Sequence, residues 1–191
     1  MSVKKEYFVL KIYQSKNTVF TIKDLALLFP GTERANLKAK TNYYVKKGVL
    51  KSLRRGVYAK SDYNFFELAT KIYTPSYISF ETVLAREGII FQHYKTVFVA
   101  SYLSRKIKVA GIDIQFRRLK ENILLDRRGI LQKENYAEAS KERAFLDALY
   151  LYKDYHFDNL DALDRKKVFS LLLLYQSKAL AKKIKGIFKN A

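Results

Sequence analysis

The side chains best suited to chemistry lie between residues 32 and 60, where amides, lysines and arginines alternate with small residues. At about 100° per residue, one face of a helix over this stretch collects small, amide and basic side chains. That face consists of Ala35, Ala39, Asn42 and Lys46, flanked by Asn36, Lys38 and Tyr43, while Arg34 lies at the margin of the opposite, inward stripe. Alanine lets a helix approach base pairs, asparagine pairs with adenine edges, and lysine reaches guanine acceptors or phosphates. We therefore predict that this face enters a groove of double-stranded DNA.

Further polar side chains surround a predicted turn after this helix, at Lys51, Ser52, Arg54 and Arg55. Gly56 can adopt the positive φ that such a turn needs, so we expect a hairpin with two arginines near its tip. Beside a groove-reading helix, this tip would contact a phosphate strand or enter a minor groove, although taken alone it could be an ordinary solvated turn. The predicted DNA-binding residues are Arg34, Asn36, Lys38, Asn42, Lys46, Lys51, Ser52, Arg54 and Arg55.

The elements around these residues have clear boundaries in the sequence. Thr32 can cap the helix and Gly48 can end it, while Leu37, Thr41 and Tyr44 form its inward stripe. The pattern also predicts two earlier helices, over residues 3–14 and 22–28. Three helices followed by a hairpin are typical of a winged helix-turn-helix, so we predict that residues 1–60 form a DNA-binding domain of this kind.

The remainder of the chain, residues 61–191, predicts a second, α+β domain. The pattern changes near residues 61–64 from a basic hairpin to an aromatic helix, without a proline-, glycine- or serine-rich linker, so we expect the two domains to pack together. Predicted strands cover residues 96–100, 107–109, 112–116 and 123–125, and predicted helices cover 64–73, 80–86, a segment from 140 onward, and 165–190. The fold class is therefore α+β, with a small antiparallel sheet and C-terminal helices.

The charge distribution supports a polyanionic partner for the first third of the chain. The net charge is +19 over 191 residues, and residues 1–60 hold 14 lysines and arginines against three acidic residues. The absence of cysteine excludes disulfides and thiolate metal sites. The sequence contains neither a signal peptide pattern nor an apolar run of the roughly 20 residues that span a bilayer. We expect a soluble cytoplasmic protein with no membrane partner.

Motifs for catalysis are weak. His93 and His156 lack metal-ligand spacing, and the sequence has no phosphate-binding glycine loop, nucleophile elbow or HExxH motif. The segment 111–117, which contains Asp113, loosely resembles the metal-binding hairpin of restriction-endonuclease-like nucleases but lacks the acidic-x-lysine half. We expect no enzyme activity, cofactor or metal, and we keep a nuclease as the less favoured alternative.

Charged residues recur on the amphipathic helix that begins near Ser140. Arg143 and Asp147 lie four positions apart, which is the spacing of an intrahelical ion pair. Asp147 also lies close to the apolar stripe that includes Phe145 and Leu149. Together with Glu142 it could therefore belong either to an inward polar network or to a surface that contacts a partner.

Three segments resemble, in this order, the AbiEi-type antitoxins of type IV toxin-antitoxin systems: RRGVYAK at 54–60, TPSYISFETVLAREGII at 74–90 and EASKERAFLDALYL at 138–151. The resemblance implies a winged-helix domain that represses its own abortive-infection operon, used in phage defence, by binding an operator with inverted repeats. It also implies an antitoxin domain that neutralises a co-encoded nucleotidyltransferase-like toxin.

Several residues take their expected roles from this resemblance alone. DNA contact is carried over to Arg54 and Arg55. The pattern of the second segment corresponds to Tyr77, Ser79 and Leu84. The antitoxin or partner surface is carried over to Glu142, Arg143 and Asp147. The alternative from a different class is a protein-interaction module that sequesters a partner and touches DNA only incidentally.

Overall fold

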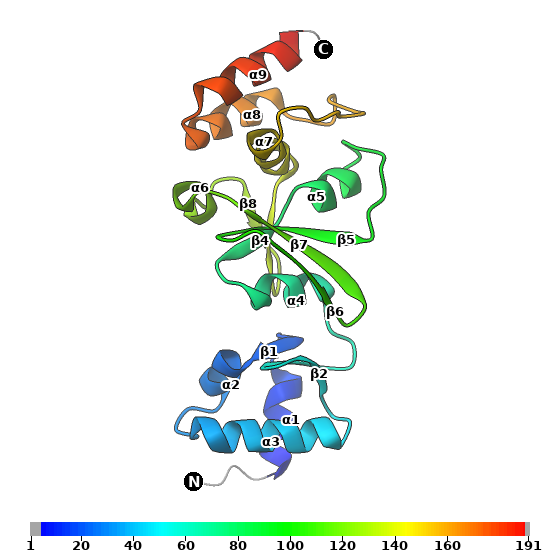
Figure 1. Ribbon diagram of the computed structural model, residues 1–191. Helices are drawn as coiled ribbons and strands as arrows, with labels where there is room; N and C mark the ends of the chain where they lie inside the picture. The colour runs from blue at the N-terminus through cyan, green and yellow to red at the C-terminus, as the bar shows by residue number, and fades with distance from the viewer. Residues whose placement is uncertain (1–4, 190–191) are drawn as a thin grey trace.

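Two β-sheets organise the chain, each with its own helices and its own apolar core. The structure, a computed structural model, describes residues 5–189. Within these residues, one sheet has three strands in the order β1-β3-β2, and the other has six in the order β6-β7-β5-β4-β9-β8. Figure 1 shows the two sheets one above the other in an elongated molecule, with the C-terminal helices at the far end.

The first sheet packs against three helices. In chain order the elements are α1 (Lys5–Gln14), β1 (Val19–Thr21), α2 (Ile22–Leu28), α3 (Arg34–Lys46), β2 (Lys51–Arg54) and β3 (Val57–Ala59). The Thr21 hydroxyl accepts a hydrogen bond from the Asp24 backbone, and the Asp24 carboxylate accepts one from the Thr21 backbone. This capping box fixes the start of α2 immediately after β1.

Stacked aromatic rings hold the three helices of this half together. Phe8 of α1 stacks on Phe29 after α2 at 4.6 Å between ring centroids, and on Tyr44 of α3 at 4.8 Å. All three side chains are buried. Because burial of each large aromatic side chain contributes about 2 kcal/mol or more, this stack fixes α3 against the other two helices.

The second half has a larger set of elements. They are α4 (Phe65–Ile72), β4 (Ser76–Ile78), α5 (Glu81–Arg86), β5 (Thr96–Ser101), β6 (Arg105–Val109), β7 (Ile112–Arg118), α6 (Glu121–Leu125), β8 (Ile130–Gln132), β9 (Ala137–Ala139), α7 (Lys141–Leu151), α8 (Arg165–Leu172), the short 3₁₀-helix η1 (Leu173–Tyr175) and α9 (Lys178–Lys189). The helix α7 begins where the sequence predicted, because the Ser140 hydroxyl caps it by accepting from the Arg143 backbone.

The predicted α+β class, with antiparallel strand pairs and C-terminal helices, is confirmed, but the second sheet differs in detail. It is mixed, because β5 pairs with β7 and β4 pairs with β9 in parallel. Residues 121–125 form the helix α6 rather than a strand. A run of three apolar residues is too short for periodicity to separate the two, and here Ile123 and Leu124 are buried on one side of a helical turn.

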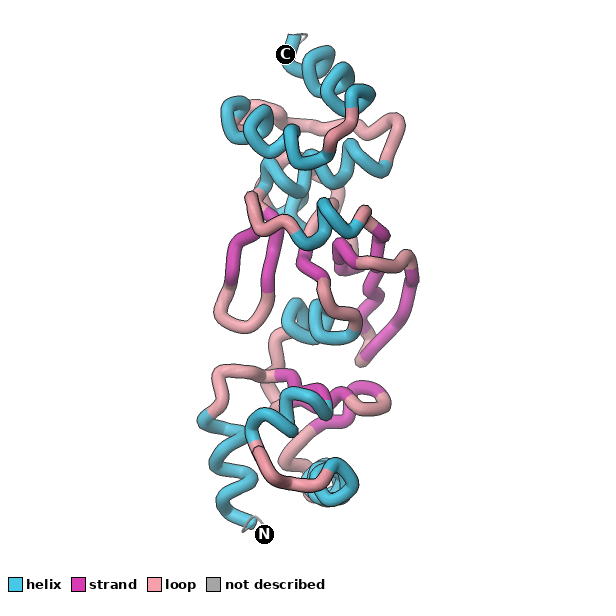
Figure 2. The backbone as a smooth tube through the Cα atoms, turned by 90° about the vertical axis from the view of Figure 1, so that its left-hand side faces the viewer, coloured by secondary structure: helices cyan, strands magenta, loops and turns pink. Residues whose placement is uncertain are grey.

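Helices cover the six-stranded sheet from both sides. In Figure 1, α7, α8 and α9 lie above the sheet and α4 lies below it, toward the first half of the chain. Figure 2 shows the same stacking from the side. Among the described residues, no helix combines the length and the apolar character needed to cross a bilayer.

The two halves share a third, smaller apolar cluster. Val19, Val57 and Ala59 of the first sheet pack with Leu68 of α4 and Val109 at the end of β6. Next to this cluster, the buried Glu67 accepts hydrogen bonds from the backbone amide of Thr18 at 2.9 Å and from its hydroxyl at 2.6 Å. The halves are therefore in contact through both apolar and polar groups.

Candidate nucleic-acid interface

The helix α3 has a buried face and an exposed face, as its sequence predicts. Leu37, Thr41 and Tyr44 are buried, and the Thr41 hydroxyl donates to the Leu37 carbonyl at 2.7 Å. The opposite side chains all remain exposed: Ala35, Asn36, Lys38, Ala39, Asn42, Tyr43 and Lys46. The inward stripe of α3 thus packs in the core, and the face that we predict to enter a groove is exposed to solvent.

The ends of α3 agree with the prediction at one terminus only. Gly48 follows the helix with a φ of 73°, which is the left-handed conformation expected of a glycine stop. At the other terminus, the prediction that Thr32 caps the helix is wrong. The N-cap position is taken by Glu33, without a side-chain cap. Its carboxylate instead accepts from the Asn36 amide at 3.3 Å, one turn along the helix.

The predicted hairpin is present between β2 and β3. Gly56 has a φ of 79° at the turn, so the sequence identified the residue that makes the turn possible. The strand register shifts between Ser52 and Arg54, which is an irregularity typical of a β-bulge. Val57 and Tyr58 of the returning strand are buried, whereas Arg54 and Arg55 are exposed. The two arginines therefore project from a hairpin that is anchored in the core.

A hollow of about 590 Å³ lies between α3 and this hairpin. It is lined by Ile22, Arg34, Lys38, Asn42, Ser52, Arg55, Gly56 and Tyr58. Five of the nine predicted DNA-binding residues thus meet here. Three are cationic, and none of the described residues that line the hollow is acidic, so its electrostatic potential favours an anion.

One side-chain contact links the helix to the sheet across this hollow. The Tyr58 hydroxyl of β3 donates to the Asn42 side-chain oxygen at 3.4 Å. This hydrogen bond leaves the two amide hydrogens of Asn42 available as donors. The orientation of Asn42 is therefore linked to the β2–β3 hairpin, whose turn carries Arg55.

The other four predicted residues lie outside the hollow. Asn36 lies on the exposed face of α3 and is bound to Glu33, while Lys46 lies in the last turn of that helix. Arg54 is exposed on the hairpin without lining the hollow. The Lys51 ammonium donates to the Ser61 carbonyl at 3.0 Å, which directs it toward the junction with the second half.

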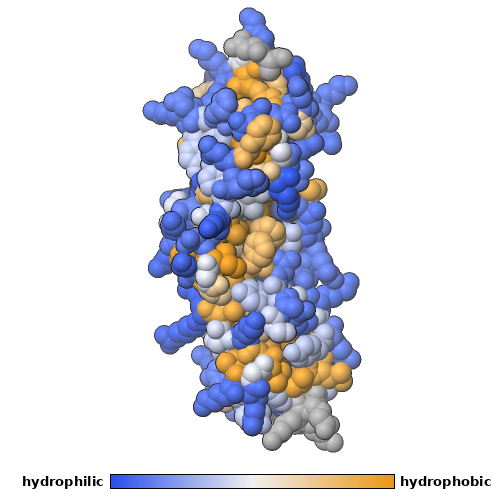
Figure 3. All heavy atoms as spheres, turned by 90° about the vertical axis from the view of Figure 1, so that its right-hand side faces the viewer, coloured by the Kyte–Doolittle hydropathy of each residue, from blue (hydrophilic) through white to orange (hydrophobic). Residues whose placement is uncertain are grey.

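The surroundings of α3 leave it accessible along most of its exposed side. Figure 1 shows α3 at the end of the molecule opposite α9, with the first sheet between α3 and the second half. Near its C-terminal end, α3 borders an apolar groove lined by Val9, Leu10, Tyr13, Tyr43, Tyr44, Lys47 and Val49. Hydrophobic residues are visibly gathered in this part of the molecule in Figure 3. The cationic hollow and the apolar groove are thus separate surfaces of the same half.

The assignment of Glu142, Arg143 and Asp147 to a partner surface is wrong, because all three side chains are buried. Arg143 and Asp147 form the predicted intrahelical ion pair, at 3.3 Å. The Arg143 guanidinium also donates to the carbonyls of Arg128 at 2.7 Å and Ile123 at 2.6 Å. Polar groups inside the protein therefore satisfy this charge, and it has no need of solvent or a partner.

Asp147 is the acceptor at the centre of the same network. Its carboxylate accepts from the hydroxyls of Tyr77 at 3.0 Å, Ser79 at 2.8 Å and Tyr175 at 2.6 Å. Burial raises the pKa of the Asp147 carboxyl, while Arg143 and the three hydroxyl donors act in the opposite direction. The inward polar network, which the sequence offered as an alternative for Asp147, is the arrangement that the structure has.

Part of this network had no signal in the sequence. The resemblance to a known family singled out Tyr77 and Ser79, and the sequence pattern predicts that Tyr175 faces inward, but nothing linked Tyr175 to Asp147, which is 28 residues away. Its hydroxyl reaches the carboxylate because η1 packs beside α7. Only the packing of α8 and η1 on α7 brings these residues together, and spacing along one helix carries no information about it.

The residues considered for metal chemistry remain apart. Within residues 5–189, no group of three or more histidine, aspartate or glutamate side chains is arranged to hold a metal ion. Asp113 lies on β7 opposite Lys108 of β6. Comparison of the chain with models of known protein families and with curated proteins finds no match to either.

Proposed function

We propose that this protein is a DNA-binding antitoxin and transcriptional autorepressor. Residues 1–60 would act as a winged helix-turn-helix that binds an operator with inverted repeats, with α3 as recognition helix and the β2–β3 hairpin as wing. The observation that supports this most directly is the cationic hollow where Arg34, Lys38, Asn42, Ser52 and Arg55 meet. Residues from two separate elements converge there, as an interface with one ligand requires.

In this proposal α3 and the hairpin make different contacts with DNA. The exposed alanines of α3 allow a close approach to a major groove, where Asn42 and Lys38 can reach base edges. Arg54 and Arg55 would then contact phosphates beside the groove or enter the adjacent minor groove. Phosphate contacts supply affinity and base contacts supply specificity, so both elements are needed for operator binding.

For residues 61–191 we propose the antitoxin role, directed against a co-encoded nucleotidyltransferase-like toxin in the cytoplasm. Its support is the similarity of segments 74–90 and 138–151 to AbiEi-type antitoxins. Much of that similarity lies in buried residues such as Tyr77, Arg143 and Asp147. The similarity therefore concerns how this half folds. In our proposal, the surface that acts on the toxin consists of other, exposed residues.

The wing is tested by replacing Arg54 and Arg55 with alanine in the full chain. We expect weaker operator binding and a salt dependence of the binding constant that is flatter by up to about two units of slope, because two phosphate contacts are lost. The measurement is a mobility-shift titration at several salt concentrations, with operator DNA from upstream of the gene.

The matched control removes two positive charges at the opposite end of the molecule, with Lys182→Ala and Lys185→Ala in α9. Both lysines are exposed. The control should bind operator like the unmodified protein. Equal losses in the two variants, or unchanged binding in the hairpin variant, would show that the hairpin is not a wing.

A further inference from the structure

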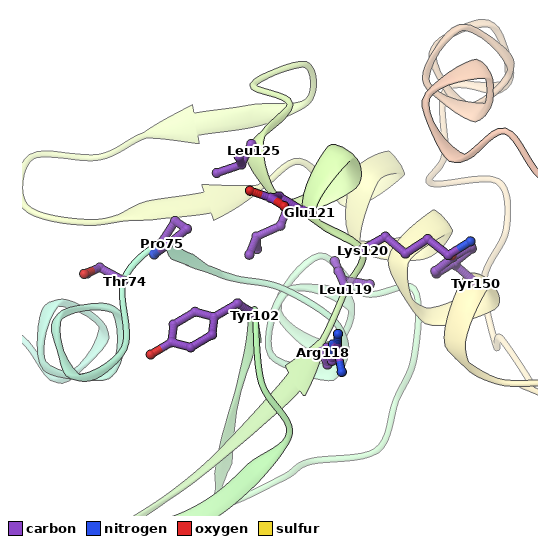
Figure 4. A pocket seen from close by; sticks show the side chains of 10 residues that line it. Thr74, Pro75, Tyr102, Arg118, Leu119, Lys120, Glu121, Leu125 and Tyr150 are labelled. Carbon is purple, nitrogen blue, oxygen red and sulfur yellow. The ribbon is translucent and has the colours of Figure 1, made fainter.

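A second hollow, of about 880 Å³, lies in the other half of the molecule and is unrelated to the DNA proposal. Figure 4 shows it between the bend after α4, the ends of β5 and β7, and the helices α6 and α7. Its lining consists of Thr74, Pro75, Tyr102, Arg118, Leu119, Lys120, Glu121, Leu124, Leu125 and Tyr150. The volume is in the range of small-molecule sites, about 300 to 1,000 Å³, and the lining is mainly apolar with a few polar groups, which is typical of such sites.

The lining is chemically different at its two ends. Tyr102 and Pro75 lie toward one side in Figure 4, whereas Lys120 runs alongside Tyr150 on the other, with Arg118 nearby and Glu121 between the two sides. One end therefore offers an aromatic ring and an apolar wall. The other end offers two cations.

These two cations have no counter-ion within the part of the chain that the structure describes. The side chains of Arg118 and Lys120 are exposed and take part in none of its ion pairs. The neighbouring Arg117 is the opposite case. Its guanidinium pairs with Glu81 and lies 4.2 Å from the centre of the Phe98 ring. Arg117 is thus part of the fold, while Arg118 and Lys120 remain able to bind an anion.

We propose that this hollow binds a nucleotide. The base would stack against Tyr102 on the side of the hollow that also holds Pro75, since every base offers a π-face to an aromatic side chain. The phosphate would be held by Arg118 and Lys120, which can form charge-assisted hydrogen bonds with it. The Glu121 carboxylate, between the aromatic side and the cationic side, is an acceptor for ribose hydroxyls.

The same chemistry is present in a free nucleotide and in the 5′-terminal nucleotide of a single strand. The test is isothermal titration of the full chain with adenosine 5′-monophosphate, and in parallel with a short 5′-phosphorylated adenine oligonucleotide. Saturable binding of the mononucleotide identifies a free nucleotide as the ligand. Saturable binding of the oligonucleotide alone identifies a strand end, provided that it depends on the residues of the hollow.

Three variants test the individual contacts. Arg118→Ala with Lys120→Ala should weaken binding about tenfold or more, since hydrogen bonds to charged groups are lost. Tyr102→Ala should weaken it about tenfold through lost stacking. Glu121→Gln should reduce the preference for adenosine monophosphate over its 2′-deoxy form. All four side chains are exposed, so folding should be preserved, and thermal unfolding followed by circular dichroism checks this.

The matched control is Lys106→Ala with Lys108→Ala, which removes the same charge from the exposed side of β6 outside the hollow. Its affinity for the nucleotide should equal that of the unmodified protein. The proposal is overturned if neither probe binds, if the control loses as much affinity as the Arg118 and Lys120 variant, or if inorganic phosphate displaces the mononucleotide at equal concentration.

Discussion

At the scale of single residues, the same chemical type serves opposite purposes in the two halves of the chain. Arg34 and Arg55 face a hollow that is open to solvent, whereas Arg143 is fully buried beside Asp147. The sequence predicted solvent-facing positions for the first two, Arg34 on the helix and Arg55 beside the turn at Gly56, and both are exposed. It predicted the ion pair of Arg143 with Asp147 but not their hydroxyl and carbonyl partners, which come from distant segments.

Glu138 on β9 is a further buried carboxylate, and its pKa predicts how the stability of the protein depends on pH. Burial raises the pKa of Glu138, but hydrogen bonds and charge interactions with Arg86 and Lys133 outweigh this, so the pKa lies below its ordinary value of 4.5. Both cations are 2.9 Å from the carboxylate. The folded protein therefore binds this proton less tightly than the unfolded chain.

The stabilisation from Glu138 is consequently complete above the ordinary carboxyl pKa and is lost as the pH falls through the lowered one. We expect the variant Glu138→Gln to be less stable than the unmodified protein near pH 6 and to show a smaller decrease in melting temperature between pH 6 and pH 3. Differential scanning calorimetry across this range measures both effects. The exposed Glu134→Gln serves as the control and should follow the unmodified protein at every pH.

At the scale of elements, prediction succeeded where a segment was long enough to show its period. The 13-residue α3 and the β6–β7 hairpin were identified from sequence. So were Gly48, which ends α3, and Gly111, which lies in the hairpin turn. The strands β1, β4, β8 and β9 were missed. Each has three residues, too few to establish a period of two; β3 is equally short but was predicted from the turn at Gly56. The strands β1 and β4 pair with partners distant in the chain, whereas β8 pairs with the neighbouring β9.

The exposed face of α3 can be tested apart from its buried face. Ala39 is exposed between Lys38 and Asn42, on the side that would approach DNA. We expect Ala39→Glu to leave the free energy of unfolding within about 0.5 kcal/mol of the original value, because surface substitutions away from special features have small effects. Operator binding should nevertheless be strongly weakened, since a carboxylate would face phosphates.

Ala39→Gln is the matched control for this change, because it has nearly the same shape without the charge. It should weaken operator binding less than the glutamate does, with the difference shrinking as the salt concentration rises. A mobility-shift titration of both variants, together with urea denaturation, separates binding from stability. Equal operator affinity for Ala39→Glu and the original protein would place the DNA elsewhere.

At the scale of the whole molecule, the two halves are joined by a polar cluster around Glu67 of α4. Its carboxylate is fully buried and bound to Thr18, and Lys71 pairs with it at 2.9 Å. The Lys71 ammonium also donates to the Val19 carbonyl at 2.6 Å. Because Thr18 and Val19 lie in the first half, α4 is bound to β1 by charge-assisted hydrogen bonds as well as by apolar packing.

We expect Glu67→Ala to lower the free energy of unfolding by about 3 kcal/mol, because the two Thr18 donors lose their acceptor and Lys71 loses its nearest carboxylate. Lys71 keeps the Val19 carbonyl and the carboxylate of Asp24 at 3.5 Å. Urea denaturation followed by circular dichroism measures the loss. The exposed Glu134→Ala is the control and should change stability by less than about 0.5 kcal/mol. A loss of that small size for Glu67→Ala as well would mean that the cluster does not hold the halves together.

The contact of Thr18 with Glu67 also limits how this protein can be re-engineered. A chimera that fuses a foreign N-terminal module to residue 61 would bury Glu67 without the hydroxyl donor that Thr18 supplies. Such a graft would need a compensating change in residues 64–71; if the first half binds an operator as we propose, its specificity could be exchanged only together with that change.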